Sequence, residues 1–440
     1  MFLLKYIAVA LGEVVLLKRH HITLLQEFSI PLIAGVILAV IWANLAPESY
    51  HHLVHGSPFS EGGVSLHFLF NDIFMVFFFG IAAKEITESC LPGGALNPPR
   101  NAVNPLLATL GGVLGPILVY MVWTHVITGD ETIGKGWGIP TATDIALAWL
   151  VARMVFGKGH PAVSFLLLLA VVDDGIGLAI IAVFYPDPSH PVQPAYILLV
   201  VAAMMLAWFM RRNGVKSFWA YMTVPGIASW AGLYTAHLHP ALALVAIVPF
   251  MPSAKVDKGL FAEDGNEKDT LNRFEHAFKL PVDLGLFGFG LMNAGVAFSS
   301  VGNATWGVLL ALMLGKTFGV FGFAMLAKTL GFPLPTGMNK KVLIVTGMVA
   351  ALGLTVALFV AGVAFTDPGL QGAAKMGALG SVLIIPLAFG FGRWFRVKRI
   401  TPIAKVILLR PKASPTITIG IGISVRDESD LIRINPRDSK

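Results

Sequence analysis

The feature that most constrains this chain is a series of apolar segments, each long enough to cross a lipid bilayer. About 20 consecutive apolar residues span the hydrocarbon core as an α-helix. Of the 440 residues, 55% are hydrophobic and only 13% are charged, whereas a soluble domain carries about 25% charged residues. The runs are unbroken, unlike the ~10-residue alternating strands of a membrane barrel. The sequence therefore predicts an all-α polytopic membrane protein.

The positions of the apolar runs predict about twelve transmembrane helices. The loops between the runs alternate in charge along the chain. Every second loop lacks Lys and Arg, as in 47–66, 186–193 and 299–303, and the remaining loops are basic. Cytoplasmic loops carry an excess of basic residues, so this alternation predicts that both termini are cytoplasmic. The predicted spans are 29–46, 67–83, 103–127, 137–155, 161–185, 194–210, 217–234, 236–251, 280–298, 304–327, 342–365 and 374–394. The basic connections carry Lys84, Arg100, Arg153, Lys158, Arg211, Arg212, Lys216, Lys255, Lys258, Lys268, Arg273, Lys328, Lys340 and Lys341.

Three regions follow from this pattern. Residues 1–28 form a cytoplasmic or interfacial segment without an evident cleavage site. Residues 29–395 form the transmembrane domain, and residues 396–440 form a cytoplasmic tail. Four prolines disfavour a helix in the tail, and the alternating residues 416–419 fit either a short strand or disorder.

Composition also excludes several classes of site. The single cysteine, Cys90, excludes a disulfide framework within the chain and a four-cysteine metal site. The net charge of +7 is explained by basic cytoplasmic loops, so no nucleic-acid partner is expected. The expected surroundings are the lipid bilayer.

Charged residues interrupt four of the apolar runs. A charge at the bilayer centre costs at least ~2.5–3.5 kcal/mol, and the adjacent Asp173 and Asp174 cost more because like charges repel. Asp144 and Lys316 lie in other predicted spans, and Asp283 lies near the cytoplasmic end of the ninth. Intramembrane charges usually mark ion pathways. The alternative is a buried ion pair that helps helices to pack, and for Asp283 local pairing is equally expected.

The neighbourhood of Asp144 predicts a break in its helix. Pro140 removes a backbone donor and clashes with the preceding turn. Thr141 and Thr143 flank the acid. A broken helix exposes carbonyl groups and a dipole end, which suit a cation. The alternative is an ordinary proline kink.

These residues have the chemistry of a cation and proton site. Na⁺ and Li⁺ prefer oxygen ligands such as carboxylates, carbonyls and hydroxyls, and carboxylates also bind protons. A site that holds one or the other, with alternating access, is sufficient for antiport. Adjacent helical residues point ~100° apart. We therefore expect unequal roles for Asp173 and Asp174, one as ion ligand and the other paired with a base such as Lys316.

The motifs resemble the NhaA-type sodium/proton antiporters. This resemblance implies two inverted repeats whose broken fourth and eleventh helices cross near the bilayer midplane. It also implies a homodimer, transported Na⁺ or Li⁺ and H⁺, and no cofactor. The matching segments are Ala142-Thr143-Asp144-Ile145-Ala146, Val172-Asp173-Asp174-Gly175, Leu314-Gly315-Lys316, Asn293-Ala294-Gly295-Val296, Phe274-Glu275-His276, Asn71-Asp72, Phe77-Phe78 and Glu85.

The resemblance also suggests roles for individual residues. Asp173 resembles the ion-binding aspartate, and Asp174 resembles the partner of Lys316. Together they form the expected Na⁺ or Li⁺ site. Thr143 and Asp144 resemble residues that balance helix dipoles. Four residues match cytoplasmic pH-sensing positions or, alternatively, polar funnel positions: Glu85, Glu275, His276 and His239.

This chain departs from the family pattern in three places. The eleventh span keeps Gly353 and Thr355 without the fuller glycine pattern. Lys279 stands where the family has a histidine, and Asp283 is unusual in its region. These departures leave the pH set-point and the transported ion open.

Two rival functions have weaker support in the sequence. Asp144 and Asp174 could serve an intramembrane aspartyl protease, and Pro240-Ala241-Leu242 resembles one of its motifs. However, the chain lacks the Tyr-Asp and Gly-x-Gly-Asp motifs. A sodium-coupled solute symporter needs a polar recognition set, which the apolar spans do not offer. The sequence therefore predicts a pH-regulated, electrogenic Na⁺(Li⁺)/H⁺ antiporter of a bacterial inner membrane, which is a secondary transporter and not an enzyme.

Overall fold

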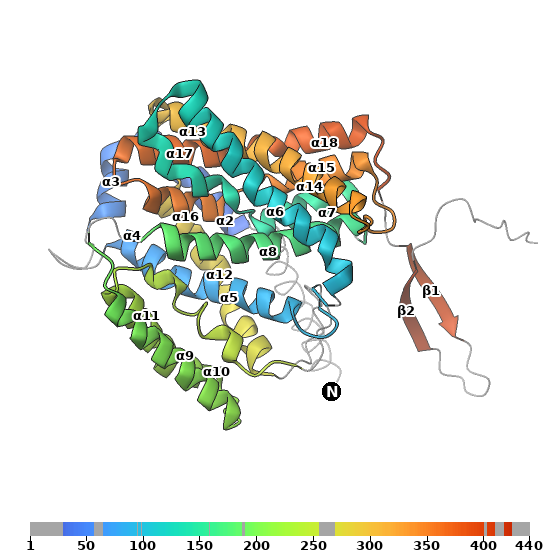
Figure 1. The fold of residues 1–440 in the computed structure, drawn as a ribbon, viewed down its shortest axis with the longest axis horizontal. Helices are drawn as coiled ribbons and strands as arrows, with labels where there is room; N and C mark the ends of the chain where they lie inside the picture. Colours follow the sequence, from blue (N-terminus) through green and yellow to red (C-terminus); the bar gives the residue numbers. More distant parts are fainter. Residues whose placement is uncertain are drawn as a thin grey trace, which may run out of the picture.

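A computed structural model describes most of the predicted membrane domain. It describes residues 30–56, 65–94, 96–97, 99–157, 159–186, 190–254, 269–399, 403–409 and 418–424. The N-terminal segment 1–28 and most of the tail lie outside these residues, as do the predicted loop lysines Lys158, Lys255, Lys258 and Lys268. The helices pack side by side into one body (Figure 1).

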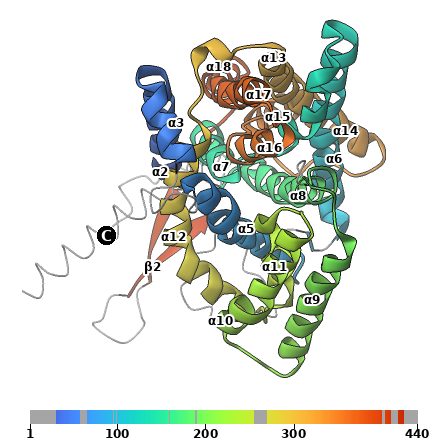
Figure 2. The ribbon, with the colours of Figure 1, turned by 90° about the vertical axis from the view of Figure 1, so that its left-hand side faces the viewer.

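The first half of the chain supplies the elements up to α8. They are α2 (Ile30–Leu45), α3 (Pro47–His55), α4 (Leu66–Phe68), η1 (Leu69–Phe74), α5 (Met75–Ser89), α6 (Pro99–Val122), η2 (Trp123–Thr128), η3 (Glu131–Thr141), α7 (Ile145–Phe156) and α8 (Pro161–Phe184). A peripheral group follows: η4 (Pro194–Tyr196), α9 (Ile197–Arg212), α10 (Phe218–Tyr221), η5 (Met222–Gly226), α11 (Ile227–Thr235), η6 (Pro240–Leu242) and η7 (Val248–Phe250). Figure 2 shows α9, α10 and α11 at the edge of the body.

The second half of the chain supplies the remaining elements. Its elements are α12 (Thr270–Asn293), η8 (Phe298–Ser300), α13 (Asn303–Leu310), η9 (Ala311–Lys316), α14 (Thr317–Thr329), α15 (Lys340–Ala350), α16 (Thr355–Ala364), α17 (Pro368–Gly380), η10 (Ser381–Leu383) and α18 (Ile384–Trp394). In the tail, β1 (Ile403–Leu409) pairs antiparallel with β2 (Thr418–Ser424). Residues 418 and 419 of the alternating segment lie in β2, whereas 416 and 417 lie outside the described residues.

The helices agree with the predicted membrane architecture. Among the described residues, six helices are long and apolar enough to cross a membrane, and up to eight if each bent pair counts as one span. Most other predicted spans coincide with shorter or more polar helices, such as the 16-residue α2. Two predicted spans, 236–251 and 280–298, need correction.

The predicted eighth span, 236–251, is not a regular helix. It consists of η6, a series of turns and η7, with Pro240 and Pro249 near its ends. Irregular backbone at membrane depth is tolerated where it is buried in protein. Ala241, Ala243 and Ile247 are completely buried here, and the Ser229 hydroxyl donates to the Ala243 carbonyl at 2.9 Å. Hydropathy alone could not distinguish this buried segment from a helix.

The predicted ninth span begins too late in the sequence. Helix α12 starts at Thr270, so Asp283 lies in the middle of the helix and not near its cytoplasmic end. The first half of α12 carries Arg273, Glu275 and Lys279, which lower its hydropathy. One of these charges, that of Glu275, is paired with Lys84 of α5.

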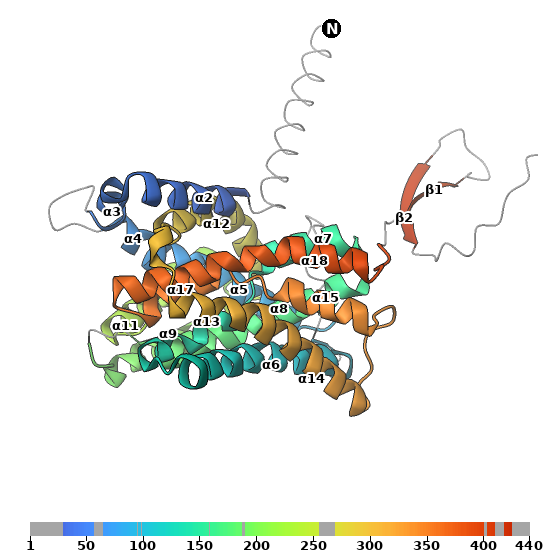
Figure 3. The ribbon, with the colours of Figure 1, turned by 90° about the horizontal axis from the view of Figure 1, so that it is seen from above.

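Close glycine contacts bring α6 against the helix that carries Lys316. Figure 3 shows α6 and α14 side by side. A Cβ on Gly319 would overlap the Gly111 carbonyl, and one on Gly315 would overlap Gly115 and Pro116. Small residues four apart allow such close helix contacts in membranes. Lys316 ends the π-helical segment η9 at this interface, and π-turns often occur at functional sites.

Two spans are broken, as the resemblance implied. η3 and α7 are bent by 59° at residues 142–144, and α15 and α16 by 49° at residues 351–354. The two breaks contact each other: the Asp144 N–H donates to the Leu352 carbonyl at 2.7 Å. In Figure 2, α7, α8, α15 and α16 gather in the middle of the body.

Candidate ion-binding site

Asp144 connects the amino ends of two half-helices. It is the N-cap of α7, and its Oδ1 accepts the Leu147 N–H at 3.0 Å. Its Oδ2 accepts the N–H of Thr355, the first residue of α16, at 3.3 Å. A helix amino end carries partial positive charge and unpaired N–H groups. One buried carboxylate therefore compensates both ends, and this places Thr355 at the site.

Gly353 permits the close approach of the two breaks. A Cβ at this position would lie 2.9 Å from the Ala142 carbonyl oxygen and 2.9 Å from a Leu312 methyl group. These distances are shorter than ordinary van der Waals contacts. The single glycine in this break is therefore sufficient for the crossing, although the family's fuller glycine pattern is missing.

Asp173 is the most completely enclosed carboxylate of the site. Its side chain has no solvent exposure, and the Lys316 Nζ lies 2.6 Å from its Oδ2. The Thr143 hydroxyl lies 2.8 Å from the same oxygen and 2.8 Å from the Ala350 carbonyl, and it donates to one of them at a time. The Lys316 Nζ also donates to the Thr141 carbonyl, which the helix break leaves free. The site thus joins α8, η9 and both broken spans.

The ion pair corrects one prediction from the sequence. We expected Lys316 to pair with Asp174, but it pairs with Asp173. Adjacent residues on α8 point in different directions, and the approach of η9 decides which of them meets the lysine. That approach depends on helix packing, which the sequence pattern does not specify.

Two carboxylate oxygens in the site have no hydrogen-bond partner among the described residues. They are Oδ1 of Asp173 and Oδ1 of Asp174, both buried. Buried polar atoms are nearly always hydrogen-bonded, and exceptions mark functional groups or sites for an ion or water. Asp174 is 7% exposed, whereas Asp173 is fully buried. These oxygens suit a hard cation, with Asp174 on the accessible side.

A second charged cluster surrounds Lys84 on α5. Its Nζ lies 2.6 Å from Glu88, 2.5 Å from Glu275 of α12 and 3.4 Å from Glu85. Lys84 is only 4% exposed, so the assignment of this residue to a cytoplasmic loop was wrong. The structure brings together two predicted pH-sensing residues, Glu85 and Glu275, and adds Lys84 and Glu88. Neither addition could be inferred from the family motif.

The two predicted histidines lie apart from the contacts of this cluster. His276 is exposed on α12. The ring of His239 packs edge-on against Phe359 of α16, with 5.4 Å between ring centroids. Asp283 is partly buried on α12.

An amide pair joins the spans of the two asparagine motifs. Asn293 Nδ2 donates to Asn71 Oδ1 at 2.7 Å, and Asn71 Nδ2 donates back at 3.2 Å. Asn293 also donates to the Phe289 carbonyl, which fixes its orientation. Both asparagines are buried, and the pair locks η1 against α12. Both motifs are visible in the sequence, but their contact depends on how η1 packs against α12.

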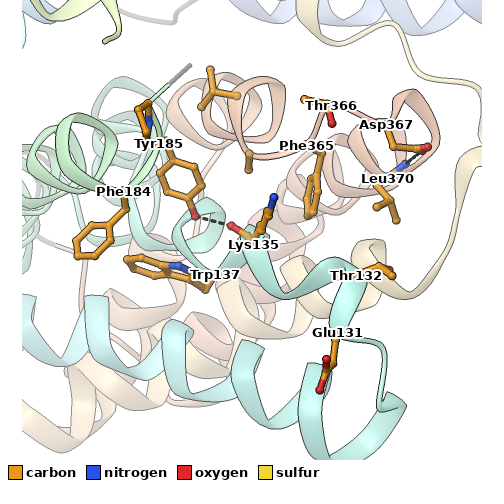
Figure 4. Close-up of a pocket in the computed structure, with 13 residues that line it drawn as sticks. Glu131, Thr132, Lys135, Trp137, Phe184, Tyr185, Phe365, Thr366, Asp367 and Leu370 are labelled. Carbon is orange, nitrogen blue, oxygen red and sulfur yellow. Dashed lines mark hydrogen bonds between the residues drawn. The ribbon is translucent and has the colours of Figure 1, made fainter. Parts of the chain in front are cut away.

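A cavity of about 600 Å³ lies at the far ends of the elements that build the site. Figure 4 shows Trp137 and Tyr185 in its wall and Glu131 at its rim. The Tyr185 hydroxyl donates to the Lys135 carbonyl and accepts the Gly138 N–H, each at 2.8 Å. Tyr185 follows directly after α8 and lies eleven positions beyond Asp174, which is ~16 Å along the helix axis. The aromatic wall and these bonds were not inferred from the sequence.

Comparison with known proteins gives a consistent result. The family model described as Na⁺/H⁺ antiporter 1 matches residues 21–390. A Na(+)/H(+) antiporter NhaA of Geobacter metallireducens is 63% identical over 383 residues, covering 87% of this chain and 100% of that protein. A Na(+)/H(+) antiporter NhaA of Desulfitobacterium hafniense is 60% identical over 384 residues, covering 87% and 98%.

One solved structure shows a related fold. The sodium proton antiporter MjNhaP1 from Methanocaldococcus jannaschii superposes with a TM-score of 0.52, covering 89% of this chain and 99% of that one. The two sequences are 14% identical, so the likeness concerns the fold alone.

Proposed function

The chain belongs to the Na⁺/H⁺ antiporter 1 family, and from this membership we propose that it exchanges Na⁺ or Li⁺ for protons at Asp173 and Asp174. It acts as a multi-pass transporter in a bacterial inner membrane, with both termini in the cytoplasm, and it exports sodium. The observation that carries the site assignment is the fully buried Lys316–Asp173 ion pair beside two carboxylate oxygens without hydrogen bonds.

In this proposal, the cation and Lys316 compete for Asp173. With protons bound, Lys316 is an ammonium paired with Asp173, and Asp174 carries a proton. An arriving cation is ligated by Asp173 and Asp174, so Asp174 loses its proton. Lys316 then leaves Asp173 and releases a proton in turn. Lysine suits this role because it changes protonation readily when buried.

This cycle gives the stoichiometry directly. The cation replaces one proton from Asp174 and one from Lys316, so one Na⁺ exchanges for two protons. The loaded forms differ by one net charge, and the exchange is therefore electrogenic. The proton gradient and the membrane potential both drive sodium out.

Alternating access is attributed to the two broken spans. Asp144 compensates the amino ends of α7 and α16, so these half-helices can shift around the ion without leaving an uncompensated dipole. Ion sites between half-helices are typical of transporters built from repeats.

The Lys84 cluster is the proposed pH-responsive mouth on the cytoplasmic side. Glu85, Glu88 and Glu275 outnumber their single lysine, so the cluster carries net negative charge when ionised and attracts cations. Protonation of Glu275, the glutamate of α12 in this cluster, would weaken the link between α5 and α12. Replacement of Glu85 or Glu275 by Gln is expected to shift the pH profile, whereas His276→Gln and His239→Gln test the two separate histidines.

The test of exchange uses everted membrane vesicles with an imposed pH gradient. Addition of Na⁺ or Li⁺ is expected to dissipate the gradient in native vesicles, whereas Asp173→Asn and Asp174→Asn vesicles retain it. The exposed Asp367→Asn variant is a matched control. Retained exchange in both site variants, at native protein levels, contradicts the assignment.

Purified protein in liposomes separates this function from its rivals. Proton flux that follows Na⁺ in the absence of any organic solute is expected, and a requirement for solute would favour a symporter. A K⁺ jump tests ion selectivity in the same vesicles. Light scattering coupled to chromatography tests the homodimer that we also propose.

A further inference from the structure

Three lysines are buried in the part of the chain that the structure describes, and one of them faces no carboxylate. Lys316 pairs with Asp173, and Lys84 pairs with glutamates. The third, Lys375 of α17, is 7% exposed, and its Nζ donates to the Gln371 side chain at 3.3 Å. A buried charge without a counter-charge is costly. Its position therefore needs a physical reason.

The elements packed against α17 do not supply a counter-charge. They are α13, α16, η3, η8 and η10, and only η3 contains titratable residues. These are Glu131 and Lys135, both exposed at the rim of the cavity in Figure 4. Asp367, the N-cap of α17, is also exposed and accepts N–H groups of its own helix. The only carboxylates buried among the described residues are the three aspartates of the ion-binding site.

Gln371, the hydrogen-bond partner of Lys375, lies at the carboxyl end of α16. The Gln371 Nε2 donates to the Gly362 carbonyl at 2.9 Å and to the Phe365 carbonyl at 3.3 Å. The last carbonyls of a helix are unpaired and carry partial negative charge, so an amide donor and a nearby ammonium stabilise them. At the amino end of the same helix, the Thr355 N–H donates to the Asp144 carboxylate, whose negative charge compensates this end. α16 is thus compensated at both ends.

We propose that Lys375 is a positioning residue for the exchange site, which fixes α16 and sets the charge around the three aspartates. This inference rests on the proposed function. When all five groups are ionised, Asp144, Asp173, Asp174, Lys316 and Lys375 carry one net negative charge, and without Lys375 they carry two. Charges in a low-dielectric interior act over longer distances than in water. Removal of Lys375 therefore makes the site more attractive to Na⁺ and to protons alike.

The test compares Lys375→Met with Lys375→Arg in everted vesicles. Met approximates the length of the lysine stem without its charge, and Arg keeps the charge. Lys328→Met, at an exposed lysine of α14, is the matched control. In Lys375→Met, the Na⁺ concentration for half-maximal exchange is expected to fall by ~3- to 10-fold, and the pH profile to move ~0.5–1 unit to the alkaline side. The other two variants keep the native values.

A purely structural role for Lys375 gives a different result. It lowers the amount of protein and the maximal rate without moving the pH profile, and that outcome overturns the proposal. Should Lys375→Met fail to accumulate, Lys375→Gln removes the charge while keeping a polar group near Gln371, and gives the same readout. Gln371→Leu removes the carbonyl bonds but keeps the charge, and is expected to lower thermal stability without a shifted profile.

Failure of this inference is distinguishable from failure of the function. Absence of Na⁺-dependent proton flux in the native protein contradicts the proposed function itself. Native exchange together with an unshifted profile in Lys375→Met contradicts only the role of Lys375.

Discussion

Lys316 and Asp173 form an ion pair with 2.6 Å between Nζ and Oδ2, and neither side chain is exposed to solvent. The lysine approaches from η9, and the aspartate lies on α8. A buried pair of this kind contributes little net stability, but loss of one partner leaves an uncompensated charge. The pair therefore adds little to the net stability of the fold, but removal of either partner alone is costly.

The first prediction concerns removal of the lysine alone. Lys316→Ala leaves Asp173 with the Thr143 hydroxyl as its only partner and is expected to cost ~3–5 kcal/mol of stability. Exchange should be lost as well. Lys316→Ala combined with Asp173→Asn should recover much of the stability without activity. Thermal unfolding in detergent measures the difference, and equal stability of the single and double variants would contradict the pairing.

The second prediction concerns Asp144 as a shared cap. Asp144→Ala removes acceptors from Leu147 and Thr355, and each lost cap costs ~0.5–2 kcal/mol. Asp144→Asn keeps an acceptor oxygen and should lose less stability. Thermal unfolding of both variants checks this order. If Asp144→Asn were the less stable of the two, shared capping would not be the main role of the residue.

The third prediction concerns the glycine contact between α6 and α14. Gly319→Val places side-chain atoms against the Gly111 carbonyl, and such overpacking costs ~1–3 kcal/mol. The helix that carries Lys316 must move away, so exchange should fall as well. Gly322→Val is the matched control, because a Cβ at Gly322 meets nothing within 4 Å. Similar unfolding temperatures for the two variants would contradict the close contact.

The fourth prediction concerns pH and His160, which caps α8 outside its membrane-spanning part. The ring Nδ1 accepts the Ala162 N–H at 3.0 Å, and burial lowers the pKa of the His160 imidazole. As the pH falls, the His160 imidazole is therefore protonated more readily in the unfolded chain than in the folded protein. This contribution to stability is complete above the unfolded pKa of ~6.5 and is lost as the pH falls from there through the lower folded pKa.

The measurement for His160 is the unfolding temperature between pH 8 and pH 5. The native protein should lose stability as the pH falls, and His160→Asn, which keeps a capping acceptor, should lose less. Identical slopes in His160→Asn and native protein would rule out this contribution.

The sequence by itself determined the membrane class, most helices, the intramembrane charges and the break at Asp144. These features follow from local properties: apolar length, charge in an apolar run, and a proline that cannot continue a helix. Where local properties are ambiguous, the predictions were wrong. The buried turns of 236–251 are as hydrophobic as a membrane span, so they were predicted to be a helix. The first turns of α12 are polar, so the start of this helix was predicted too late.

Only the tertiary structure decided which charges meet. The sequence assigned Lys316 to Asp174, yet the packing of η9 against α6 brings Lys316 to Asp173. The sequence places Lys84 in a loop and Lys375 at the start of the last predicted span, whereas the structure buries Lys84 among three glutamates and Lys375 beside Gln371. The physical reason is that burial and ion pairing depend on which helix faces lie together, and residues far apart in the chain supply those faces.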